Sequence, residues 1–187
     1  SNSYVSDEII TSHAGRRVLV VNTDAEGRML MLDLLSPARC DITAAPAAER
    51  PATTVHTVAT LTGHALLTVG IGYTIAVDNG PARQAGVSAA LQAVGQAWGD
   101  PFEVSSLRRE DYAFVAPTTP EYDVKQCNAA PSSQTMRGHQ FPAAVMLIAS
   151  GLDKHGVDSE DPIAYTHLDI AGSSAYAPFS DGQTTGS

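Results

Sequence analysis

The sequence predicts an α/β fold in which a mixed β-sheet is flanked by helices on both faces. Short runs of β-branched and other apolar residues alternate along the chain with longer apolar segments that suit buried helices. Glycine, proline and aspartate mark the boundaries between these segments. The chain has 187 residues, of which 43% are hydrophobic and 17% are charged, so one domain with a sizeable core is expected.

The N-terminal part predicts an extended lead-in, a strand and a helix. Tyr4–Ser12 is expected to be extended, and Val18–Val21 to form a buried strand because three of its four residues are β-branched. A buried helix should follow Gly27 and run to about Ala38, unless the proline just before that residue ends it earlier. The segment of residues 40–52 is rich in alanine and proline and should be a loop.

Strands and helices continue to alternate along the rest of the chain. Strands are expected at Thr53–Ala59, Tyr73–Val77 and Ile163–Ile170, and helices at His64–Val69, Ala82–Trp98 and Ala143–Ala149. The buried candidates of the second of these helices are Ala85, Ala89, Leu91, Val94 and Trp98. The charged cluster Arg108–Asp111 is expected to be exposed surface.

Composition excludes several classes of function. The formal net charge of −9 argues against nucleic acid and anionic membranes as partners. No apolar run approaches the length of a membrane span. Cys40 and Cys127 form no Cys-x-x-Cys pair, so we expect two reduced, buried thiols in a cytosolic protein. A nucleotide site at Gly70-Ile71-Gly72 is disfavoured because the third glycine of a dinucleotide loop is missing.

The segment Asn22–Arg28 carries the residues with the clearest chemistry. Asp24, Glu26 and Arg28 follow the strand Val18–Val21 at every second position, at a strand end where α/β proteins bind ligands. Two carboxylates on extended backbone would project to one side and need a cation between them, such as zinc, magnesium or manganese. The arginine could hold an anion. The same pattern would also suit the acidic first turn of a helix with a surface salt bridge.

The string Asn22–Arg28 resembles the signature of the leucine aminopeptidase family, the di-zinc cytosol aminopeptidases. Further stretches are similar to that family in the same order: Ala59–Gly63, Arg137-Gly138 before a helix, and Tyr165–Gly172. Together they cover nearly all of the chain, and the divergence is strongest between Phe102 and Thr135.

The resemblance implies a role for each residue of the signature. Asp24 would bind one zinc ion through its side chain and its own carbonyl, and Glu26 would bridge both zinc ions. Arg28 would hold a bicarbonate that acts as general base toward the bridging water. Two metal ions arranged in this way would activate the water and stabilise the developing oxyanion.

The resemblance also implies a substrate site and two structural residues. Thr60, Leu61, Gly63 and Ala171 would line the pocket for the substrate's N-terminal residue, with the Leu61 carbonyl accepting from the amino or amide group. His167 and Asp169 would be strand residues of structural weight rather than metal ligands.

The family's first signature, with two lysines and two aspartates that complete the metal site, has no counterpart in this sequence. The resemblance therefore implies that residues 1–187 are the C-terminal portion of a single metallo-aminopeptidase catalytic domain whose upstream part is absent from this chain. The chain would act only with that missing N-terminal half. It would be a cytoplasmic hexamer that removes N-terminal, leucine-like residues from peptides. The alternative is a catalytically inactive structural or binding protein of the same fold.

Overall fold

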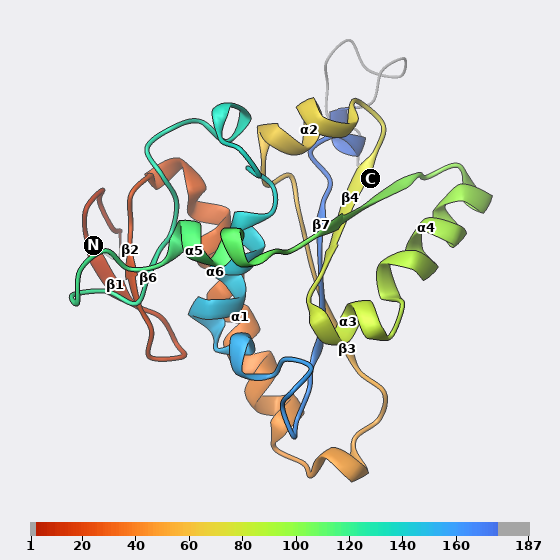
Figure 1. Ribbon diagram of the computed structural model, residues 1–187, viewed down its shortest axis with the longest axis horizontal. Coiled ribbons are helices and arrows are strands. Elements are labelled where there is room, and N and C mark those ends of the chain that lie inside the picture. The colour runs from red at the N-terminus through yellow and green to blue at the C-terminus, as the bar shows by residue number, and fades with distance from the viewer. Residues whose placement is uncertain (1–2, 176–187) are drawn as a thin grey trace. The chain divides into compact units, whose positions relative to one another are not determined.

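A computed structural model describes residues 3–175, which divide into two compact units (Figure 1). The first unit contains residues 3–53, 108–129 and 141–163, and the second contains residues 54–107, 130–140 and 164–175. Each unit has its own mixed sheet with helices beside it. The predicted α/β class is confirmed, with the strands divided between two sheets.

The sheet of the first unit has three short strands in the order β1-β2-β6: β1 (Ile9–Thr11), β2 (Arg17–Leu19) and β6 (Val124–Lys125). β1 and β2 are antiparallel, whereas β2 and β6 are parallel. Val18 and Val20 are fully buried, in keeping with the predicted strand, although β2 ends at Leu19. Strand β6, which the sequence did not predict, lies in the region between Phe102 and Thr135 where the resemblance to the family is weakest.

The helices of the first unit pack around α6 (Phe141–Ser150), in which nine of ten residues are buried. Helices α1 (Glu26–Thr43) and α5 (Arg109–Val115) both contact it. The Phe114 and Phe141 rings meet with their centroids 4.9 Å apart. Short 3₁₀ turns lie at Thr23–Ala25 (η1), Ala47–Glu49 (η2) and Leu152–Lys154 (η4).

Helix α1 is longer than the sequence predicts. It continues through Pro37 to Thr43, past the expected end near Ala38. The Arg39 side chain explains part of this, because its Nε donates to the Ser150 carbonyl at 3.2 Å and so ties the last turns of α1 to the end of α6. Tertiary packing here outweighs the local preference of proline.

The sheet of the second unit has four strands in the order β3-β7-β4-β5: β3 (Thr54–Ala59), β7 (Ala164–Asp169), β4 (Thr74–Asp78) and β5 (Phe102–Ser106). β3 pairs with β7 in parallel, β7 with β4 antiparallel, and β4 with β5 in parallel. Three of these strands lie at the predicted positions. All five residues of β4 are buried, so this strand forms the centre of the unit.

The predicted helix Ala82–Trp98 is wrong as a single element. The structure has α3 (Gly80–Gln84) and α4 (Val87–Trp98), separated at Gly86, whose φ of 71° is left-handed. The Asp78 carboxylate stabilises the break because its Oδ2 accepts from Ser88 N at 3.1 Å and from Ser88 Oγ at 2.6 Å. Helix α2 (Gly63–Val69) lies as predicted, and 3₁₀ turns lie at Ser132–Gln134 (η3) and Ser173–Ala175 (η5).

The buried side of α4 also differs from the prediction. Ser88 and Gly95 are buried, whereas Val94 is 58% and Trp98 84% exposed. Leu91 is half-buried, and the predicted alanines at 85 and 89 are exposed. Gly95 permits the close approach, because a Cβ there would lie 2.6 Å from the Phe102 ring.

The charged cluster at residues 108–111 is not entirely exposed. Asp111 is buried and accepts a hydrogen bond from Arg108 N at 2.7 Å, which caps the N-terminus of α5. Within residues 3–175, none of the helices is long and apolar enough to cross a membrane.

Candidate functional site

The carboxylates of the signature lie at the start of α1. Asp24 is in the turn η1 and Glu26 is the first residue of the helix, and both side chains are exposed. The Asn22 side chain caps this turn, since its Oδ1 accepts from Asp24 N at 3.0 Å. The expected extended backbone is therefore wrong, and the alternative of an acidic first helical turn describes the local conformation.

Gln126 holds this turn in place, although no sequence pattern predicts its role. Its Oε1 accepts from Val21 N at 3.2 Å and from Asn22 N at 3.1 Å. Its Nε2 donates to the Asn22 carbonyl at 2.8 Å and to the Ala25 carbonyl at 3.2 Å. The side chain is fully buried, so all four hydrogen-bonding positions of its amide serve the backbone between β2 and α1. No local signal marks a glutamine that acts on a segment about a hundred residues away.

Arg28 lies inside the unit and is 2% exposed. Its Nη1 donates to the Gln126 carbonyl, and its guanidinium carbon lies 5.1 Å from the centroid of the Phe141 ring. Hydrogen bonding and the aromatic face both stabilise a buried guanidinium. Arg28 thus connects the first turn of α1 to β6 and α6.

A pocket of about 350 Å³ opens beside Glu26 in the first unit. Most of its wall is apolar, and Glu26 shares it with a second carboxylate; the other lining residues are Tyr4, Ile10, Ser12, Met29, Leu30, Leu32 and Asp33. Burial raises the pKa of the Tyr4 hydroxyl, and the Glu26 charge adds to this. The pocket offers space for an apolar group close to a carboxylate.

Asp24 and Glu26 are the candidate metal ligands of this turn. Both are exposed oxygen donors on adjacent turns, a type of donor that zinc, magnesium and manganese accept. Among residues 3–175 there is no group of three or more His, Cys, Asp or Glu side chains that could hold a metal ion. Two carboxylates could therefore bind metal tightly only together with further donors.

The predicted substrate-binding residues belong to the second unit, at the carboxyl ends of the parallel strands β3 and β7. Thr60 and Gly63 are exposed, whereas Leu61 and Ala171 are partly buried. Asp169 pairs with Ala59 at the ends of these strands, and its carboxylate accepts hydrogen bonds from the backbone of both segments. The structure therefore brings the residue-60 segment and Ala171 together.

Asp169 and His167 have structural places in β7. Both are fully buried, and the Nδ1 atom of His167 lies 2.9 Å from the Thr57 hydroxyl on β3. The same hydroxyl lies 2.7 Å from the Tyr165 hydroxyl. Burial raises the pKa of Tyr165 well above its ordinary value, against the opposing effect of this hydrogen bond.

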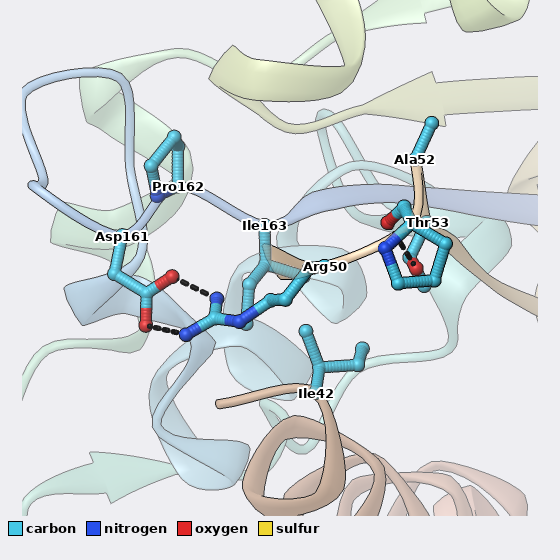
Figure 2. Close-up of a pocket in the computed structure, with 8 residues that line it drawn as sticks. Ile42, Arg50, Ala52, Thr53, Asp161, Pro162 and Ile163 are labelled. Carbon is cyan, nitrogen blue, oxygen red and sulfur yellow. Dashed lines mark hydrogen bonds and ion pairs between the residues drawn. The ribbon is translucent and has the colours of Figure 1, made fainter. Parts of the chain in front are cut away.

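A second pocket of the first unit, of about 270 Å³, is lined by Arg50 and Asp161, which no sequence pattern singled out (Figure 2). Both carboxylate oxygens of Asp161 accept from the guanidinium, with Nη2 at 3.1 Å. The remaining Nε donates to the Ala45 carbonyl at 2.6 Å. Because each of the three guanidinium nitrogens already donates a hydrogen bond, we interpret this pair as a clamp between two loops rather than a ligand site.

The fold and the carboxylates at the start of α1 define an α/β protein with a candidate metal-binding turn. The chain belongs to the cytosol aminopeptidase family, because the model of that family's catalytic domain matches residues 1–187. The glycines 70 and 72 precede strand β4, which is not the strand-to-helix context of a nucleotide loop.

The similar proteins are larger than this chain. A Caenorhabditis elegans protein named as an aminopeptidase is 44% identical over 95% of the chain and 33% of its own length. A Tropheryma whipplei protein named as a cytosol aminopeptidase is 28% identical over 88% of the chain and 29% of its own length. A leucyl aminopeptidase structure from Trypanosoma brucei shares the fold, with a TM-score of 0.72 and 22% identity, over 98% of this chain and 31% of that one. The chain thus spans about a third of the length of these relatives.

Proposed function

We propose that this chain is part of a metal-dependent aminopeptidase that hydrolyses N-terminal, apolar residues from peptides. The observation that carries the proposal is the match of the whole chain to the family's catalytic domain, with exposed carboxylates at Asp24 and Glu26. The chain would work together with the remainder of the catalytic domain. A hexameric, cytoplasmic assembly is part of the same proposal.

Asp24 and Glu26 would hold two divalent ions, with zinc as the first candidate and manganese or magnesium as the others. When bound, such ions lower the pKa of a water molecule and polarise the scissile carbonyl. The chain's own contribution is to present two oxygen donors from a turn that Gln126 holds by four hydrogen bonds. The fixed turn spares the enzyme the entropy of ordering these ligands.

Arg28 would act close to the carboxylates from a buried position. A bicarbonate held by Arg28 would lie in the interior of the unit, next to Gln126 and Phe141, which contact the guanidinium. A buried arginine is always charged, so it would favour an anion near the start of α1. The positive end of the α1 dipole would act in the same direction.

Thr60, Leu61, Gly63 and Ala171 would bind the N-terminal residue of the peptide. Their segments follow strands β3 and β7, and ligands commonly bind at the carboxyl ends of strands in α/β proteins. The Leu61 carbonyl would accept a hydrogen bond from the substrate, while Ala171 leaves room for an apolar side chain.

The metal role can be tested in the complete protein, where this chain is accompanied by the remainder of the catalytic domain, with Asp24→Asn and Glu26→Gln, which keep the size of each side chain and remove its charge. The matched control is Asp41→Asn, an exposed carboxylate near the other end of α1. We expect each site variant to lose bound zinc, measured by elemental analysis, and to hydrolyse leucine p-nitroanilide at least ~100-fold more slowly, since ligand loss removes the activated water. The control should match the wild type in both measurements.

A catalytically inactive protein of the same fold is the competing explanation. It predicts no bound metal and no hydrolysis in the wild type, whatever the state of Asp24 and Glu26. Full zinc content and rate in Glu26→Gln would also contradict the proposed role of this residue.

A further inference from the structure

The Asp169 carboxylate joins the two segments that carry the proposed substrate-binding residues. Its Oδ1 accepts hydrogen bonds from Leu61 N at 3.1 Å, Thr62 N at 3.4 Å and Ala171 N at 3.2 Å. Its Oδ2 accepts from the Thr62 hydroxyl at 2.6 Å. One side chain therefore binds the loop after β3 and the loop after β7 at the same time.

Asp169 lies in the interior of the unit, so its carboxyl group depends on these hydrogen bonds. The residue is fully buried, and its recorded donors are backbone amides and a hydroxyl. Burial raises the pKa of the carboxyl, and the hydrogen bonds from Thr62 and the backbone oppose this. A buried carboxyl group is tolerated only while its hydrogen-bond partners remain in place, so its burial favours the ordered loop.

Thr62 connects the Asp169 carboxyl group to the start of helix α2. Its hydroxyl donates to Asp169 and also accepts from Ala65 N at 3.1 Å, which makes Thr62 the N-cap of α2. The first turn of α2, including Gly63, is therefore placed by the same carboxylate.

The two segments differ in how much they depend on Asp169. After Ala171, the chain is packed tightly on its neighbours: a Cβ at Gly172 would lie 2.5 Å from the Tyr73 carbonyl oxygen and 2.7 Å from that of Gly70. Gly72 N also donates to the Gly172 carbonyl at 2.9 Å. The segment that contains Ala171 is thus held by contacts other than Asp169. The backbone amides of Leu61 and Thr62, in contrast, donate to the Asp169 carboxylate.

We propose that Asp169 is a positioning residue for substrate binding, which holds the Leu61 carbonyl in register with Ala171 so that both meet the N-terminal residue of the peptide. This inference rests on the proposed aminopeptidase function. It assigns to Asp169 a role in substrate affinity, exerted through the loop, without contact between the carboxylate and the substrate.

The test compares Asp169→Asn, Thr62→Val and Thr62→Ser in the intact protein, with Asp100→Asn as an exposed control from the same unit. Hydrolysis of leucine p-nitroanilide, bound metal and amide hydrogen exchange are measured for each. We expect Asp169→Asn to raise KM about tenfold and to change kcat by less than about twofold, as for loss of uniform binding. Metal content should be unchanged, and the amides of Leu61 and Thr62 should exchange faster.

The threonine variants separate positioning from a general loss of stability. Thr62→Ser keeps the hydroxyl and should retain the wild-type KM, whereas Thr62→Val should raise it. If Asp169→Asn fails to fold, Thr62→Val decides the question in the same assays. A KM unchanged in every folded variant, with only the melting temperature lowered, would overturn the inference.

The exchange measurement keeps this inference distinct from the proposed function. A wild-type protein without metal or peptidase activity would contradict the proposed function. Unchanged exchange of the Leu61 and Thr62 amides in Asp169→Asn would contradict the positioning role, whether or not the wild type is active.

Discussion

Two histidines of the second unit should make its stability sensitive to mild acid. His64 on α2 and His139 place their Nδ1 atoms 2.8 Å apart. One hydrogen fits between two nitrogens at this distance, so one ring donates and the other accepts. On its other side, the His139 Nε2 lies 2.8 Å from the Ser105 hydroxyl. If both rings were protonated, two N–H groups would point at each other and the contact would break.

The size of the effect follows from the separation of the rings, whose centroids are 5.0 Å apart. Two unit charges at that distance repel by about 3 kcal/mol at an effective dielectric constant of about 20, and by about 1 kcal/mol in water. His139 is 2% exposed and His64 is partly buried, so the expected cost lies between these limits.

The sign is set by the change in protonation on unfolding. Burial lowers the pKa of His64 below its ordinary value of 6.5, so the unfolded chain binds this proton more readily than the folded one. The unfolding free energy should be highest above pH 6.5 and fall as the pH drops below that value. We expect the unfolding free energy at pH 5 to be lower than at pH 7.5, by at most the ~3 kcal/mol that two charged rings would cost.

Urea unfolding followed by far-ultraviolet circular dichroism at several pH values would measure this loss. His64→Gln should remove most of it, while His56→Gln, an exposed histidine on β3, should retain it. A His64→Gln variant with the same pH dependence as the wild type would refute the reasoning.

Three further substitutions test the packing at two glycines and the Arg50–Asp161 ion pair. Gly138→Ala should destabilise the second unit by about 1–3 kcal/mol, because a Cβ there would lie 2.4 Å from the Ser132 carbonyl oxygen. Gly156→Ala has no atom within 4 Å of the added Cβ, and thermal melting should show little change; equal melting temperatures for both variants would contradict this view of the packing. Arg50→Met should lower the melting temperature at neutral pH by breaking the clamp with Asp161. The arginine lowers the pKa of Asp161 below 3.8, so the difference from the wild type should shrink as the pH falls below that value, and a constant difference would argue against the ion pair.

Local sequence patterns were sufficient for the elements whose burial is uniform. Strands β3, β4 and β7 and helices α2 and α6 lie within a few residues of their predicted positions. In these segments the β-branched or apolar pattern agrees with the tertiary packing. The predictions failed where a side-chain contact decides a boundary, as with Arg39 at the end of α1 and Asp78 at the break between α3 and α4.

The candidate site could likewise be predicted only in part from the sequence. The residue types of Asp24, Glu26 and Arg28 could be recognised in the sequence, but their backbone could not. An extended and a helical segment can carry the same Asp-x-Glu-x-Arg string, and the structure has the helical one. The helical conformation is held by Gln126, which lies about a hundred residues further along the chain. Its side-chain amide forms hydrogen bonds with the backbone of this turn.

The sequence by itself determined the α/β class, the family resemblance and the identity of the chemical groups, because these depend on residue types and their order. Only the tertiary structure decided that the strands form two sheets, that Arg28 is buried against Gln126 and Phe141, and that Asp169 joins the Leu61 and Ala171 segments. Hydrogen bonds between residues about a hundred positions apart leave no periodic signal along the chain. Their partners become identifiable only when folding brings the strand ends together.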